Sequence, residues 1–243
     1  MAISLITGAP GAGKSYSAVR LTVVPALDLG REIWTNIPLS VTEIQAVWPG
    51  AVIRQLDLAD SDVWRVIPGG ALVLIDEAYK IWPAGQRADK VPSLQVEFVG
   101  MHRHRVGLVV GPNGDQHLST EIVLITQGST DIAKWVRTKV DRTYIVRKLD
   151  AVGLDRRYRV EIYEKWEDTL RPRKSKLMRT YTGIYEDRYT RLYHSHTQAS
   201  PDAVDVSELR ADRSATIWSR GLLVRLAAVP LLIALSLYLV GQM

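Results

Sequence analysis

The eight residues Gly8–Ser15, GAPGAGKS, constrain the fold of this chain more than any other stretch. They match the spacing G-x-x-x-x-G-K-[ST], in which backbone N–H groups surround phosphate oxygens and the lysine reaches the β- and γ-phosphates. The apolar stretch 3–6 precedes the loop, and residues 16–24 have helical character up to Pro25. A strand, a phosphate loop and a helix in this order predict an α/β fold of the P-loop NTPase class that binds ATP and Mg²⁺.

The residues expected to contact the nucleotide are those of the loop and the helical residue that follows it. Lys14 is predicted to neutralise phosphate charge during catalysis, and the Ser15 hydroxyl to bind Mg²⁺. The full set of predicted nucleotide contacts is Gly8, Ala9, Pro10, Gly11, Ala12, Gly13, Lys14, Ser15 and Tyr16.

A second half of the site is predicted where a buried strand ends in two acids. Residues 71–75 are all apolar, which is typical of a parallel strand buried on both faces, and Asp76 and Glu77 follow directly. The carboxyl ends of such strands form the ligand crevice of an open α/β sheet. We therefore expect Asp76 to hold Mg²⁺ and Glu77 to orient the attacking water; otherwise Asp76 caps a helix and Glu77 is solvated.

Two further candidates lie later in the chain. Residues 121–127 predict a third buried strand, and Gln127 at its end is expected to sense the γ-phosphate or position water, or else simply to end the strand. Residues 93–105 predict a helix with a basic end. There Arg103 is the candidate arginine finger for a neighbouring subunit, with Arg105 as its rival and a basic helix end as the alternative.

Four stretches together resemble the zonular occludens toxin family: GAPGAGKS, LVLIDEA at 72–78, HRH at 102–104 and IVLITQ at 122–127. That family includes the inner-membrane assembly ATPase of filamentous phages. The resemblance implies a ring-shaped homo-oligomer, with the hexamer as the expected form, that acts with phage coat and assembly proteins. It also supports the roles given above to Lys14, Ser15, Asp76, Glu77 and Gln127.

The chain departs from the family pattern in two places. Residues 105–121 separate HRH from the next strand, and their central turn, 111–115, predicts an inserted hairpin. Many family members also continue past the membrane into a periplasmic domain, whereas three residues follow the apolar run here. Toxin activity is therefore not expected.

Residues 151–197 are predicted to form a β-rich extension that is basic and rich in tyrosine. Its segment 171–179, RPRKSKLMR, is expected to contact single-stranded phage DNA, with backbone charge neutralised and bases stacked on the rings. A contact with anionic lipid, and a solvated hairpin or subunit contact, are the alternatives.

The C-terminal part of the sequence predicts a membrane anchor. After a linker at 198–220, residues 221–240 are apolar enough for one transmembrane helix, and basic residues precede this run but none follows it. The positive-inside tendency therefore places the N-terminal domain in the cytoplasm and the anchor in the host inner membrane. The chain has no cysteine, which excludes disulfides and thiol catalysis.

These features predict a membrane-anchored ATPase of phage assembly whose core is residues 1–150. Two alternatives remain at this point. One is a DNA-translocating ATPase that grips single-stranded DNA through the extension. The other is a membrane scaffold that binds nucleotide as a switch with negligible turnover.

Overall fold

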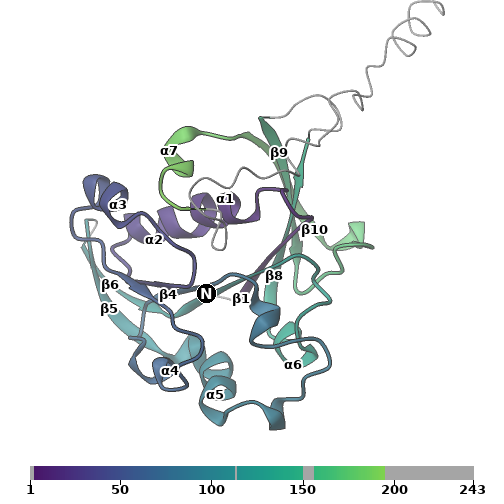
Figure 1. Ribbon diagram of the computed structural model, residues 1–243, viewed down its shortest axis with the longest axis horizontal. Coiled ribbons are helices and arrows are strands. Elements are labelled where there is room, and N and C mark those ends of the chain that lie inside the picture. The colour runs from purple at the N-terminus through teal and green to yellow at the C-terminus, as the bar shows by residue number, and fades with distance from the viewer. Residues whose placement is uncertain (1–2, 113, 150–155, 195–243) are drawn as a thin grey trace, which may run out of the picture. The chain divides into compact units, whose positions relative to one another are not determined.

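The computed structural model describes residues 3–112, 114–149 and 156–194. Their centre is an eight-stranded sheet with the order β10-β9-β8-β1-β7-β4-β2-β3 (Figure 1). The strands are β1 Ile3–Thr7, β2 Ile33–Thr35, β3 Ile53–Gln55, β4 Leu72–Ile75, β7 Glu121–Thr126, β8 Val140–Lys148, β9 Arg157–Glu164 and β10 Leu177–Ile184. This confirms the predicted α/β class and its mostly parallel sheet.

The central strands are parallel and are buried on both faces. Strand β1 pairs in parallel with β7 and with β8, while β4 lies between β7 and β2. Every residue of β1 and of β4 is buried, as continuous apolar runs in a parallel sheet require. Since β7 separates β1 from β4, the loop after β1 and the acids after β4 flank the end of β7.

Helices cover both faces of this sheet (Figure 1). One face packs against α1 Lys14–Ala18, α2 Val24–Asp28 and α3 Val41–Val47, and the other against α4 Val63–Val66, α5 Ser93–Met101 and α6 Lys134–Arg137. The second face is rich in aromatic residues: Trp64, Trp82 and Phe98 are each at most 2% exposed, and the Trp64 ring contacts both of the others. The two apolar layers bury both faces of the central strands.

The helix after the loop does not end at Pro25 as the sequence predicts. A π-helical turn, η1 Val19–Val23, joins α1 to α2, and Pro25 stands in the first turn of α2. A proline inside a regular α-helix lacks an N–H donor and clashes with the carbonyl four residues before it, and the wider π-helical turn directly before Pro25 is where the helical segment departs from that geometry. The helical segment therefore continues to Asp28.

The hairpin that the sequence predicts is confirmed. Strands β5 Val106–Gly111 and β6 Gly114–Ser119 pair antiparallel in a separate two-stranded sheet. Gly107 lies directly against the Gly69 carbonyl oxygen, where a Cβ atom would be only 1.9 Å away, so this contact requires glycine.

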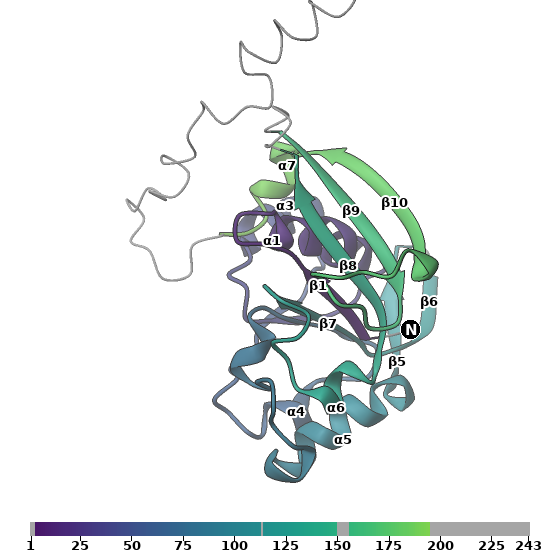
Figure 2. The same ribbon diagram turned by 90° about the vertical axis from the view of Figure 1, so that its right-hand side faces the viewer.

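Residues 158–194 contribute to the same core as the N-terminal half. Strands β9 and β10 extend the sheet beyond β8, and they are long and curved (Figure 2). Tyr158, Val160 and Leu192 pack in one apolar cluster with Ile6 and Tyr16. The short helix α7, Asp187–Thr190, follows β10. Two tyrosines of this region are accordingly buried: Tyr158 and Tyr163 are at most 3% exposed.

Within the described residues, the structure contains no helix with the length and apolar character of a membrane span. The predicted linker, 198–220, and the predicted transmembrane run, 221–240, lie outside the described residues.

Candidate nucleotide site

The phosphate loop begins where β1 ends and is held there by the neighbouring strand β7. Thr7 is level with Thr126 across the pair, and the Thr7 hydroxyl donates a hydrogen bond to the Gln127 carbonyl oxygen at 2.9 Å. The Gly8 N–H donates to the same oxygen at 3.4 Å. A Cβ atom on Gly8 would lie 2.4 Å from the carbonyl oxygen of Val146 in β8, so only glycine fits at the start of the loop.

Gly13 turns the chain from the loop into α1, and a tyrosine from far along the sequence covers it. Gly13 has φ +85°, a left-handed conformation that favours glycine. A Cβ atom there would lie 2.3 Å from the hydroxyl oxygen of Tyr185, and that hydroxyl donates to the Ala12 carbonyl oxygen at 3.2 Å. The residue after β10 therefore fixes the conformation of the phosphate loop from outside.

Lys14 lies close to both predicted acids. Its Nζ atom donates to the Ala9 carbonyl oxygen at 3.1 Å, within the loop. Burial lowers the pKa of Lys14, and the charges of Glu77 and Asp76 oppose that shift. Partial desolvation strengthens the attraction of the ammonium group for a phosphate, and the two carboxylates add negative charge that suits a divalent cation at the same place.

Asp76 is positioned by its own backbone and by an asparagine. Its N–H donates to Asn36 Oδ1 at 2.7 Å, and Asn36 Nδ2 donates to the Asp76 carbonyl oxygen at 2.9 Å. Asp76 Oδ1 accepts a hydrogen bond from the Glu77 N–H at 2.9 Å. Burial raises the pKa of Asp76, while that N–H and the Lys14 charge act in the opposite direction.

The backbone conformation of Glu77 and the burial of its carboxylate are typical of a residue with a catalytic role. It adopts φ 54° and ψ 47°, a left-handed conformation that costs a non-glycine residue free energy. Its Oε2 atom is buried and accepts no hydrogen bond from the described residues. A carboxylate oxygen in this state is suited to accept a hydrogen bond from a water molecule at the γ-phosphate.

The residues predicted to hold Mg²⁺ fit that ion chemically. Mg²⁺ prefers oxygen ligands and usually binds through one or two carboxylates together with phosphates and water. In the described part of the chain the Ser15 hydroxyl is engaged in no hydrogen bond, and only one carboxylate oxygen of Asp76 accepts one. Both residues therefore retain oxygen atoms for a cation.

Gln127 and Arg103, the two remaining predicted catalytic residues, lie in different parts of the structure. Gln127 lies beside the loop, but its main-chain oxygen makes the contacts and its side chain is exposed. Arg103, in the short helix η4 His102–His104, forms an ion pair with Asp141 at the start of β8. The start of β8 is level with the start of β1, so Arg103 lies at the opposite edge of the sheet from its own chain's loop.

A second contact from the C-terminal half lies at the edge of the sheet where the phosphate loop begins. The Thr169 hydroxyl lies 3.1 Å from that of Thr7, and the Thr169 N–H donates to Ser129 Oγ at 2.9 Å. In turn, the Ser129 N–H donates to Thr169 Oγ1 at 3.2 Å. Asn36, Thr169 and Tyr185 are thus supporting residues that no motif in the sequence indicates.

A comparison with known protein families identifies the family to which this chain belongs. The family model of the zonular occludens toxin (Zot) matches residues 2–200. The chain belongs to the Zot family. The crystal structure of the N-terminal domain of zonular occludens toxin from Neisseria meningitidis is similar, with a TM-score of 0.55 and 25% sequence identity. That similarity covers 79% of this chain and 98% of the meningococcal domain.

Two phage proteins are also similar to this Zot-family chain. ORF301 of Pseudomonas phage Pf3, which is named as an assembly protein, is 31% identical over 139 residues. The Gene 1 protein of Xanthomonas phage phiLf is 22% identical over 239 residues. These alignments cover 57% and 87% of this chain but 40% and 48% of the relatives, so the chain spans less than half the length of the curated relatives it matches.

The contact between Tyr185 and the loop can be tested by removing one oxygen atom. The substitution Tyr185→Phe should weaken ATP binding about 2- to 10-fold, because a partly buried hydrogen bond contributes about 0.5–1.5 kcal/mol to the folded loop. Isothermal titration calorimetry measures this change. Tyr163→Phe is the matched control, since its hydroxyl donates to Glu161 Oε2 and β9 ends beside Asp141, at the edge of the sheet opposite the loop. An unchanged dissociation constant in Tyr185→Phe would contradict the role given to this hydroxyl.

Proposed function

We propose that this chain hydrolyses ATP at Gly8–Ser15 and uses the energy to assemble and extrude filamentous phage at the host inner membrane. The observation that carries the proposal is the convergence of Lys14, Asp76 and Glu77 at one edge of the sheet. Membership of the Zot family and the name of the Pf3 relative as an assembly protein support a role in phage assembly.

Each residue of the site has a distinct task in this proposal. The backbone of the loop and Lys14 bind the phosphates and neutralise their charge. Ser15 and Asp76 would hold Mg²⁺, and the ion would supply positive charge that offsets the charge of the phosphates. Glu77 accepts a hydrogen bond from the attacking water and orients it, and the Gln127 side chain senses the γ-phosphate or helps to position that water.

The proposal includes a ring-shaped homo-oligomer. Arg103 is remote from its own loop, so a catalytic role for it requires a neighbouring subunit. In a ring, such an arginine stabilises the charge of the transition state across the subunit boundary. The apolar run 221–240 would anchor the ring, with the ATPase domain in the cytoplasm, close to membrane-embedded coat and assembly proteins.

A DNA-translocating ATPase is the weaker candidate. It relies on tyrosine rings that stack on bases, yet Tyr158 and Tyr163 are buried and Tyr181, Tyr185 and Tyr189 pack against the core. A buried ring offers no face to a base. Contacts to the DNA backbone through the basic segment remain compatible with this alternative.

The deciding experiment is steady-state phosphate release by the full chain in nanodiscs. We expect hydrolysis of ATP that depends on Mg²⁺ and that single-stranded DNA does not accelerate. Chelation of the metal is the control. Acceleration by DNA would favour the translocase, and tight ATP binding without phosphate release would favour the nucleotide-switched scaffold and contradict the proposal.

A further inference from the structure

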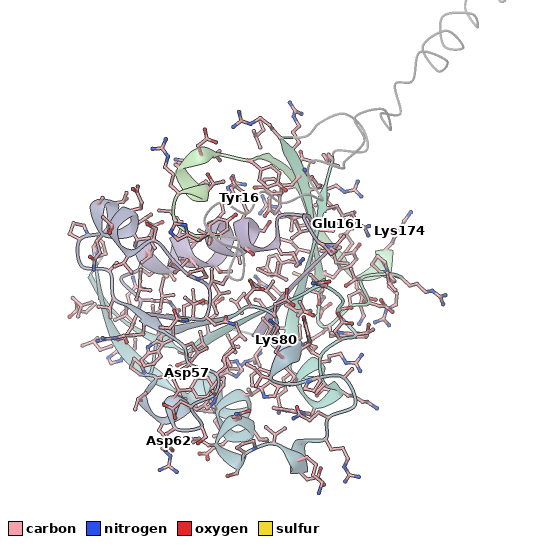
Figure 3. All side chains as sticks on the ribbon, viewed as in Figure 1. Tyr16, Asp57, Asp62, Lys80, Glu161 and Lys174 are labelled. Atoms are coloured by element: carbon pink, nitrogen blue, oxygen red, sulfur yellow. The ribbon has the colours of Figure 1, made fainter. Side chains whose placement is uncertain are left out.

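Positive charge is concentrated between the end of β9 and the first residues of β10. We call residues 170–179, LRPRKSKLMR, the basic loop; it contains five cations and no acid. It includes the short helix η6, Lys174–Lys176, and Lys174 reaches away from the body of the domain (Figure 3). The cations are Arg171, Arg173, Lys174, Lys176 and Arg179.

A buried carboxylate holds the loop in shape. Glu167 is only 2% exposed, and it accepts hydrogen bonds from Arg173 Nε at 3.0 Å and from the Arg173 backbone N–H at 3.3 Å. Lys176 lies 4.0 Å from the same carboxylate. The remaining cations, Arg171, Lys174 and Arg179, are exposed and have no ion-pair partner among the described residues.

Several arginines of this domain are paired with acids, whereas Arg171, Lys174 and Arg179 are not, among the residues that the structure describes. Arg20 and Arg188 pair with Glu186, and Arg103 pairs with Asp141. The basic loop therefore presents a positive charge that the fold does not neutralise. Such a charge attracts a polyanion or an anionic surface.

Aliphatic side chains accompany the exposed cations. Leu170 is 86% exposed and Met178 is 57% exposed, one at each end of the loop. The loop contains no aromatic residue, so it cannot stack on the bases of a nucleic acid. Cations next to exposed aliphatic groups match a lipid surface instead, where the charges meet anionic headgroups and the apolar groups enter the acyl boundary.

We infer that the basic loop docks on an anionic membrane surface. Arg171, Lys174 and Arg179 contact lipid headgroups, and Leu170 and Met178 insert beside them. Each cation near an anionic bilayer raises the docked fraction relative to the free fraction about fivefold, so the three together contribute roughly a hundredfold. This contact is independent of ATP hydrolysis, although Leu170 directly follows Thr169, which contacts Thr7 at the end of β1.

The chain has no cysteine, so a single introduced thiol can be labelled without a background. The full chain carrying Met178→Cys is labelled with a fluorophore and incorporated into vesicles that contain a spin-labelled quencher lipid. The vesicles are phosphatidylcholine with or without phosphatidylglycerol. Val47→Cys is the matched control, because Val47 is 62% exposed on α3 and has no basic cluster beside it.

We expect lipid quenching at position 178, but not at position 47, only when phosphatidylglycerol is present. Raising the salt to roughly 1 M should abolish the quenching because charges are then screened beyond about 3 Å. The triple substitution Arg171→Gln, Lys174→Gln and Arg179→Gln should also abolish it.

Three results would overturn the inference. One is an absence of quenching at position 178 in anionic vesicles, and another is equal quenching at positions 47 and 178. The third is displacement of the label from lipid by an oligothymidine at physiological salt, which would assign the loop to nucleic acid. Because the readout is fluorescence, it separates this inference from any failure of the ATPase assay.

Discussion

Replacing Glu77 by glutamine should lower ATP turnover about 10²- to 10⁴-fold, the usual contribution of a residue that accepts a proton or orients water. Glutamine has nearly the same size, but it cannot take a proton from the attacking water. ATP affinity should stay within about twofold of the parent value, since Lys14 and the loop carry the phosphate contacts. Phosphate release gives the turnover, and calorimetry gives the dissociation constant.

The control for this prediction is Glu164→Gln, which makes the same chemical change at an exposed position at the end of β9. Its turnover should equal that of the parent. If Glu77→Gln hydrolysed ATP at the parent rate, the role of Glu77 as the water-orienting residue would be wrong. Its strained conformation would then need another explanation.

The second large effect concerns the stability of the domain rather than its chemistry. Tyr158→Ala should reduce the free energy of unfolding by about 3–5 kcal/mol, as large aromatic truncations in a core do. The Tyr158 ring is fully buried, with centroid distances of 5.4 Å to Tyr16 and 4.9 Å to Tyr185. Its hydroxyl also accepts a hydrogen bond from Arg20. Urea denaturation followed by tryptophan fluorescence measures the change.

Thr182→Ala in β10 is the matched control, because Thr182 is exposed in the strand next to β9. It should change the free energy of unfolding by less than about 0.5 kcal/mol. A loss below 1 kcal/mol in Tyr158→Ala, which is roughly the effect of an ordinary surface change, would mean that β9 is dispensable for the core.

The parts of the site that the sequence predicts are those carried by consecutive residues. The loop at Gly8–Ser15 and the strand ending in Asp76 and Glu77 are local patterns, in which apolar runs stop at turn and polar residues. Parallel strands end at a common edge, so the two motifs meet there once the sheet order is known. The order itself, with β7 between β1 and β4, depends on long-range pairing.

The supporting residues are not predictable in this way. Asn36, Thr169 and Tyr185 lie 40, 162 and 173 residues along the chain from the site residues that they contact. Each is an ordinary polar residue in its own segment, and only the tertiary fold gives it a function. The tyrosines of the C-terminal half show a limit of reading composition alone. Their number favours a surface that binds DNA, whereas Tyr158, Tyr181 and Tyr185 pack in the apolar cluster that contains the first helix.

The position of β1 in the sheet has a consequence for folding during synthesis of the protein. Although β1 is the first strand made, both of its partners come from residues 121–148, and the ring that covers Gly13 belongs to Tyr185. At a synthesis rate of roughly 5–20 residues per second, Tyr185 is made about 10–30 s after the loop. Until residues 121–148 are made, β1 has neither of its partner strands, and the ring over Gly13 comes later still, so the phosphate loop is completed late in translation of the domain.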